Sequence, residues 1–122
     1  MHHNDTRQKI EGRFRLCHQD ELAEQPCLEF RLGEGDWPLR VFLVKTEGEI
    51  HAFRNVCPHA GLPLNFKPDS FLTPDGSAII CSVHGAMFEK TSGECLAGPC
   101  FGRSLLSYPV EITGEGQVCI SV

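Results

Sequence analysis

Two short segments of the chain combine cysteine with histidine at close spacing, Cys57-x-His59 and Cys81-x-x-His84. Thiolate sulfur and imidazole nitrogen are the ligands that zinc and iron–sulfur centres use in proteins. The chain has 7 cysteines and 6 histidines, so each spacing arises by accident about a third of the time. The two motifs suggest metal ligation. The residues around them are needed to distinguish a true metal site from a chance spacing.

The residues beside the two motifs indicate rigid loops. Pro58 fixes its own backbone φ and biases Cys57 away from helix. Gly85, directly after the second motif, allows the backbone to pass close to a bound group. A third loop at residues 95–100 contains Gly98-Pro99 and can cover a site that the first two loops form. Three stiff loops on a β scaffold are an arrangement suited to holding a site.

This pattern resembles the Rieske family, whose motif is Cys-x-His, a spacer, Cys-x-x-His, and then a loop containing Gly-Pro. The spacer here, residues 60–80, is somewhat longer than expected for the family, and the resemblance covers nearly the whole chain. It implies one [2Fe–2S] cluster in which Cys57 and Cys81 bind one iron and His59 and His84 bind the other. It also implies that the histidines lie toward solvent, where they serve as the electron port.

The resemblance further predicts a reduction potential near the low end of the Rieske range. Neutral imidazoles leave the oxidised cluster without net charge, which raises its potential above that of a four-thiolate cluster. Rieske proteins of quinol-oxidising complexes have a disulfide between the cluster loops, where this chain has Leu62 and Val83. They also place hydroxyl donors where this chain has Ala86 and Phe88. With fewer donors to sulfur, we expect a potential on the order of −150 mV.

Length and composition are those of one acidic globular domain, residues 1–122. The chain has 11 basic and 16 acidic side chains and a net charge of −5, which disfavours nucleic acid and anionic membranes as partners. No segment approaches the roughly 18 consecutive apolar residues of a membrane helix. The first residues lack the apolar stretch of a signal peptide, so we expect a cytoplasmic protein. An odd number of cysteines argues against a disulfide scaffold.

Short runs separated by glycine and proline predict an all-β fold, a small antiparallel sandwich or barrel. Turns are expected at Glu47-Gly48 and residues 113–116, and a short helix at residues 19–24. We expect a base of residues 1–54 and 105–122 that carries an inserted cluster-binding subdomain of loops, residues 55–104. The expected strands are Phe14–His18, Cys27–Leu32, Leu39–Lys45, Ile50–Asn55, Ala78–Ser82, Ala86–Glu89, Leu105–Ile112 and Gln117–Val122.

The remaining cysteines and histidines have ordinary expected roles. His18 and His51 are expected at the surface or as caps. Cys95 and Cys100 are interpreted as small buried thiols rather than as a redox-active pair. The cysteines expected in the core are Cys17, Cys27 and Cys119. Most apolar residues near the motifs are expected to pack, except that Leu62 is expected to be exposed for docking; the others are Leu64, Phe66, Met87 and Phe88.

The function expected from these features is that of a soluble one-electron carrier, a low-potential ferredoxin that serves an oxygenase or a reductase. It is not expected to be an enzyme, because the chain has no second set of histidines and carboxylates that could bind a catalytic iron. Its partners are then redox proteins. Three alternatives stay open: a small subunit of a larger reductase such as nitrite reductase, an iron or redox sensor, and a zinc-stabilised binding module.

Overall fold

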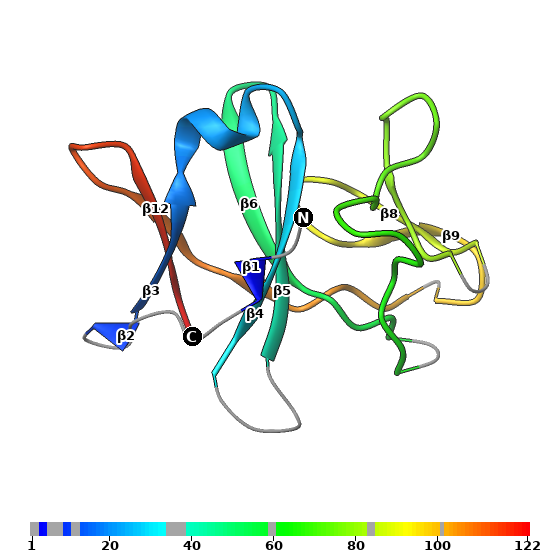
Figure 1. Cartoon of the computed structure of the whole chain (residues 1–122). Helices are drawn as coiled ribbons and strands as arrows, with labels where there is room; N and C mark the ends of the chain where they lie inside the picture. Colours follow the sequence, from blue (N-terminus) through cyan, green and yellow to red (C-terminus); the bar gives the residue numbers. More distant parts are fainter. Residues whose placement is uncertain are drawn as a thin grey trace.

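The computed structural model describes residues 3–4, 9–10, 13–33, 39–58, 61–82, 85–100 and 102–122 (Figure 1). Strands dominate this part of the chain, with one short 3-10 helix, η1 (Gln19–Leu22). The strands are β1 (His3–Asn4), β2 (Lys9–Ile10), β3 (Arg13–His18), β4 (Cys27–Leu32), β5 (Leu39–Thr46), β6 (Glu49–Arg54), β7 (Ile79–Ile80), β8 (Met87–Phe88), β9 (Cys95–Ala97), β10 (Ser107–Tyr108), β11 (Val110–Ile112) and β12 (Gln117–Ser121).

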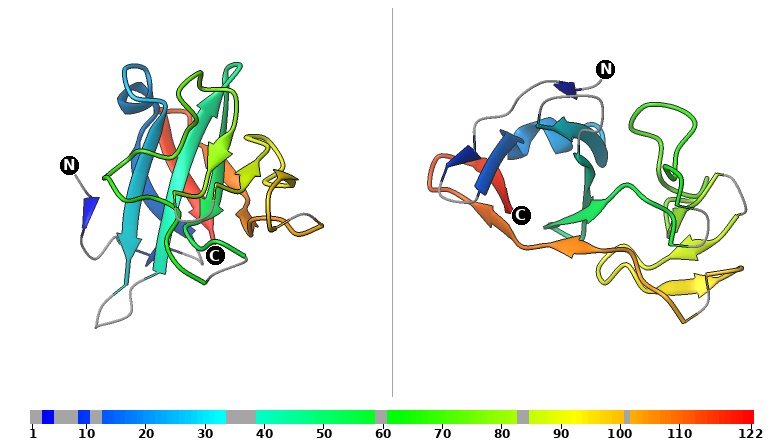
Figure 2. Two further views of the ribbon diagram at one scale, coloured as in Figure 1. Left: turned by 90° about the vertical axis from the view of Figure 1, so that its right-hand side faces the viewer. Right: turned by 90° about the horizontal axis from the view of Figure 1, so that it is seen from below.

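The strands form three sheets, with the orders β1-β4-β5-β6-β10, β11-β12-β3-β2 and β7-β8-β9. Among the strands that the structure describes, every pairing is antiparallel except that of β1 with β4. The five-stranded sheet lies in the middle, with the four-stranded sheet on one side and the three-stranded sheet on the other (Figure 1 and Figure 2). The small sheet and its loops therefore rest on one face of a larger β framework.

The sequence of β5 explains why the middle sheet supports both sides. Val41, Phe42, Leu43 and Val44 are all completely buried. Neighbouring side chains of a strand point to opposite faces. Val41 and Leu43 accordingly join the apolar cluster shared with the four-stranded sheet, and Phe42 and Val44 join the cluster under the loops. A continuous apolar run is what a strand covered on both faces requires.

The structure confirms the all-β fold and most of the expected strands, and it corrects one expected strand and one expected loop. The run expected at residues 105–112 is divided at Pro109 into β10, in the five-stranded sheet, and β11, in the four-stranded sheet. Proline has no N–H to donate to a ladder, so the chain changes sheets there. Residues 95–97, expected as loop, form β9 against Met87 and Phe88. In the described residues, no helix has the length and apolar character to span a membrane.

Candidate metal centre

The loops that follow Cys57 and Cys81 have the same backbone hydrogen bonds. The Cys57 N–H donates to Leu62 O at 2.7 Å, and the Gly61 N–H donates to Cys57 O at 2.8 Å. In the second loop the Cys81 N–H donates to Ala86 O, and the Gly85 N–H donates to Cys81 O, both at 2.8 Å. The chain thus builds one loop shape twice, with the cysteine at the first position each time.

A glycine with positive φ completes each of these loops. Gly61 has φ of +70° and Gly85 has φ of +75°, a conformation that residues with a Cβ adopt only at a cost. The two loops are joined by a hydrogen bond of 2.7 Å from the Ser82 N–H to Leu64 O. These bonds fix the main chain on both sides of the two cysteines.

Both loop cysteines are completely removed from solvent. Cys57 and Cys81 belong to one apolar cluster, which also contains Leu64, Ala86 and Phe88. A buried thiolate without a compensating cation is unfavourable, whereas iron neutralises the thiolates that bind it. Two thiols held in one dry cluster by equivalent loops therefore fit a metal centre that uses them as ligands on one side.

The two predicted histidine ligands, His59 and His84, lie outside the described residues. Each stands between the cysteine and the glycine of its loop in the sequence, two residues after Cys57 and three after Cys81. Among the residues that the structure does describe, no three metal-binding side chains come together. The ligand set of Cys57, His59, Cys81 and His84 stays a prediction.

The third loop contacts the second cysteine loop through Gly98, and Arg103, shortly after it, contacts the first. Gly98 has φ of +96°, and a Cβ there would lie 2.8 Å from the Cα of Ala86, which closes the second loop. Arg103 Nη1 donates to the carbonyl of Pro58 in the first loop at 2.8 Å. The glycine expected to cover the site is thus required for close contact between main chains, and an arginine that the sequence did not single out fixes the loop on its other side.

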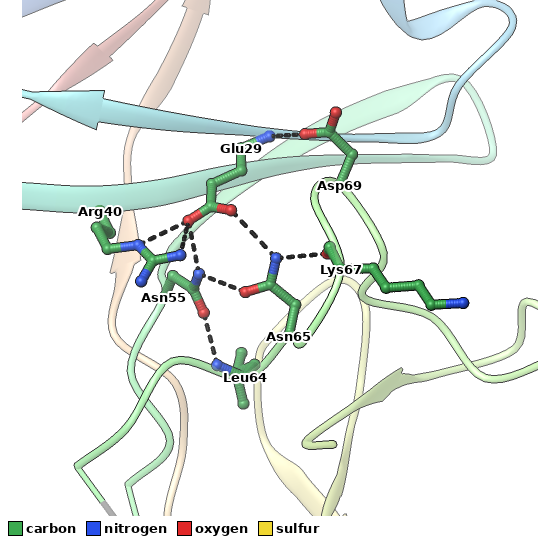
Figure 3. A network of polar contacts seen from close by, with 7 residues as sticks. All are labelled: Glu29, Arg40, Asn55, Leu64, Asn65, Lys67 and Asp69. Carbon is green, nitrogen blue, oxygen red and sulfur yellow. Dashed lines mark hydrogen bonds and ion pairs between the residues drawn. The ribbon is translucent and has the colours of Figure 1, made fainter. Parts of the chain in front are cut away.

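Beneath the first loop, a polar network surrounds the carboxylate of Glu29, which is completely buried (Figure 3). Arg40 donates to Glu29 Oε2 through Nε at 2.8 Å and contacts the same oxygen through Nη2 at 2.5 Å. Asn55 Nδ2 donates to Oε2 at 2.9 Å, and Asn65 Nδ2 donates to Oε1 at 3.1 Å. A buried charge is tolerated when it is paired and hydrogen-bonded in this way.

The same network ties the first loop to the middle sheet. Asn55 Oδ1 accepts the Leu64 N–H at 2.8 Å, and Asp69 Oδ1 accepts the Glu29 N–H at 2.6 Å. The strands β4 and β5 thereby set the position of the chain on either side of the first motif. Sequence reasoning missed these residues, and the one available signal was the carboxylate of Glu29 inside the largely apolar run of Cys27–Leu32.

The apolar surface beside the first loop is partly as expected. Leu62 is 49% exposed, as predicted, while Leu64 and Phe88 are completely buried. Phe66, one of the residues grouped with the expected core, is instead 77% exposed. Both exposed side chains border a surface pocket of about 350 Å³, whose lining also includes Arg31, Arg40, Asn65 and Lys67. An apolar surface with basic groups thus lies next to the first cysteine loop.

The other cysteines and histidines have the structural roles that were expected. All seven cysteines are buried, and burial followed by the nearby Asp69 carboxylate raises the pKa of Cys27 to about 12. His18 caps η1 by accepting the Asp20 N–H on Nδ1 at 3.1 Å. His51 is partly exposed on β6. Cys100 differs from the others in position, because its sulfur lies 3.7 Å from that of Cys57.

The sequence of this chain is similar to those of known proteins. Residues 12–110 match the family model described as the Rieske [2Fe-2S] domain. The chain is 34% identical over 107 residues to the ferredoxin component of the alkene monooxygenase system of Xanthobacter autotrophicus. This match covers 86% of the present chain and 77% of that protein. It is 35% identical over 79 residues to human apoptosis-inducing factor 3, covering 65% of this chain and only 12% of that much longer protein.

Solved structures share the fold. The ferredoxin of carbazole 1,9a-dioxygenase from Nocardioides aromaticivorans superposes with a TM-score of 0.68, covering 91% of this chain and 98% of that one. The sequence identity in that comparison is 19%, so the similarity shows the arrangement of sheets and loops and nothing finer.

Proposed function

Because the chain belongs to the Rieske [2Fe–2S] domain family, we propose that it is a one-electron carrier with one [2Fe–2S] cluster. It is a ferredoxin rather than an enzyme, and its partners are the redox proteins of an oxygenase or reductase system. We place it in the cytoplasm as a soluble protein. The cluster supplies a site that accepts and returns a single electron; the chain itself binds, shields and orients that site.

In this proposal Cys57 and Cys81 would hold one iron of the cluster, and His59 and His84 would hold the other. The observation that carries it is the repeated loop, in which each cysteine occupies the same position relative to its hydrogen bonds and its glycine. Ligands that are fixed before the cluster binds need little rearrangement when its charge changes. Complete burial of both cysteines keeps water away from the sulfur side and leaves the histidine side for electron exchange.

The division into a base and a cluster-binding subdomain, residues 55–104, is part of this proposal. The three-stranded sheet lies wholly within residues 79–97, whereas β10 pairs with β6 of the middle sheet. The Glu29 network then serves as the joint between base and subdomain. A rigid joint of this kind would hold the cluster-binding subdomain in a fixed position on the base.

The proposed potential is low for a Rieske centre. Ala86 and Phe88, which take the places of hydroxyl donors, are completely buried, and neither side chain can donate a hydrogen bond. A cluster with fewer donors to its sulfur atoms gains less stabilisation on reduction. Such a carrier suits the delivery of electrons to an oxygenase better than the oxidation of quinol.

The test is anaerobic purification of the full chain, followed by measurement of iron, acid-labile sulfide, and visible and EPR spectra. We expect iron and sulfide in equal amounts and the EPR signal of a reduced histidine-ligated cluster. Cys57→Ser and Cys81→Ser should lose the cluster, whereas Cys119→Ser, a buried cysteine of β12, should retain it. His84→Cys should lower the potential or lose the cluster. A colourless protein that contains zinc would contradict the proposal and favour a structural metal site.

A further inference from the structure

The thiols of Cys57 and Cys100 are in contact, although 43 residues of chain separate them. Their sulfur atoms are 3.7 Å apart, and both side chains are completely buried. Cys57 is the first residue of the first motif, whereas Cys100 belongs to neither motif. The proposed ligand set does not include Cys100, although its sulfur lies against that of a proposed ligand.

The position of Cys100 is set by contacts on both sides of it. Its carbonyl accepts the Arg103 N–H at 2.9 Å, and the guanidinium of Arg103 donates to Pro58, the residue after Cys57. On the other side, Gly98 lies against Ala86 with no room for a Cβ. These contacts keep the Cys100 thiol beside the first loop, so the sulfur pair is a product of the loop packing.

We propose that Cys57 and Cys100 form a disulfide when the iron-free chain meets a peroxide, and that this disulfide prevents cluster loading until a dithiol reduces it. The bond itself rests on the geometry of the two thiols. Its consequence for loading rests on the proposed function, in which Cys57 is an iron ligand. Cys100 then controls, through the redox state of the chain, whether the first ligand is available.

The reaction balances as a two-electron oxidation. One thiol sulfur attacks the peroxide, so that a sulfur–oxygen bond forms, the oxygen–oxygen bond breaks and water leaves. The second thiol then attacks that sulfur, which forms the sulfur–sulfur bond and releases the oxygen as a second water. Two thiols are oxidised to one disulfide while hydrogen peroxide is reduced to two waters. A dithiol reverses the change and becomes a disulfide itself.

Burial makes this pair selective. A disulfide requires its sulfurs at about 2.05 Å, so a side-chain rotation and a small loop shift must bring these neighbours together. Hydrogen peroxide is small enough to enter a packed interior during such motions. Cys95, on the same segment as Cys100, instead directs its Sγ to the carbonyl of Ala97 at 3.3 Å, away from this reaction.

The test uses the full chain, stripped of iron by chelation under reducing conditions, freed of reductant and treated with hydrogen peroxide. Peptide mapping without reduction should give a single Cys57–Cys100 linkage and the loss of two of the seven thiols. Reconstitution with iron and sulfide should fall severalfold and recover after dithiothreitol. Cys100→Ser should abolish the linkage and keep loading insensitive to peroxide, while the matched control Cys95→Ser should behave as the wild type.

Other results would overturn the proposal. One such result is that all seven thiols survive the peroxide treatment, and another is a linkage between Cys57 and Cys81. A third is a mixture of linkages in an iron-free chain that circular dichroism shows to be unfolded. A chain that forms the Cys57–Cys100 bond but never accepts a cluster, even as untreated Cys100→Ser, would contradict the proposed function and leave the disulfide standing. A chain that loads normally with the disulfide in place would overturn the blocking step alone.

Discussion

The side-chain amide of Asn55 donates a hydrogen bond of 2.9 Å to the carboxylate of Glu29, and both side chains are buried. The same amide accepts the N–H of Leu64 through its oxygen. A single residue thus connects the charge beneath the first cysteine loop with the main chain that closes it. The geometry of the loop depends in this way on a strand that is distant in sequence.

Asn55→Ala should therefore destabilise the chain strongly. The change leaves the buried Leu64 N–H without its acceptor and removes a donor from a buried carboxylate, and each such loss costs roughly 1–3 kcal/mol. We expect a loss of about 2–4 kcal/mol in the free energy of unfolding by urea. Asn65→Ala, at a half-buried residue of the same network, should lose less. Equal effects of the two substitutions would contradict the bridging role of Asn55.

Gly98→Ala should be more damaging than Gly102→Ala. Both glycines have positive φ, +96° and +90°, but only Gly98 has backbone within 4 Å of the added Cβ. The backbone strain common to both costs about 1–2 kcal/mol, and the collision with Ala86 should add about 1–3 kcal/mol. Iron release to a chelator should also be faster in Gly98→Ala, because the third loop is displaced. Similar stability and release rates would show that the close contact is unimportant.

Ala86→Ser should raise the reduction potential. The substitution adds a hydroxyl donor at a buried position directly after the second motif, and a hydrogen bond to cluster sulfur stabilises the reduced state. Redox titration followed by EPR measures the midpoint. Ala52→Ser is the matched control, since Ala52 is equally buried but lies in the cluster on the other side of the middle sheet. An unchanged or lower midpoint in Ala86→Ser would refute the argument on missing donors.

The turn at Asp75 should resist acid. Hydrogen bonds from the side chain of Thr73 and from the backbone and hydroxyl of Ser77 lower the pKa of Asp75 from 3.8 to about 2. The pKa of Asp75 is lower in the folded chain than in the unfolded chain, so its carboxylate stabilises the turn at any pH above the unfolded pKa. This contribution is lost as pH falls through about 2. An NMR titration of the Asp75 carboxyl should show this midpoint. In Thr73→Val it should move upward, and a midpoint near 3.8 in the wild type would contradict the prediction.

Local sequence determined most of the strands. The run Cys27–Leu32 was predicted with the bounds that the structure has, because apolar side chains and flanking turns are properties of neighbouring residues. The turn at Glu47-Gly48 was also predictable, and both residues have positive φ, +51° and +80°, as a type I′ hairpin turn requires. By contrast, β9 has three residues and depends on pairing with β8, so its own sequence contains too little signal.

For the site, the sequence by itself predicted the candidate ligands: two thiols, two imidazoles and their spacing within loops that proline and glycine stiffen. Only the tertiary structure decided what surrounds them, including the carboxylate of Glu29 beneath the first loop and the thiol of Cys100 against Cys57. Residues 43 positions apart meet only because the order of strands and the packing of loops bring them together. Residue type and spacing fix which groups are present, whereas contacts between distant segments depend on the whole fold.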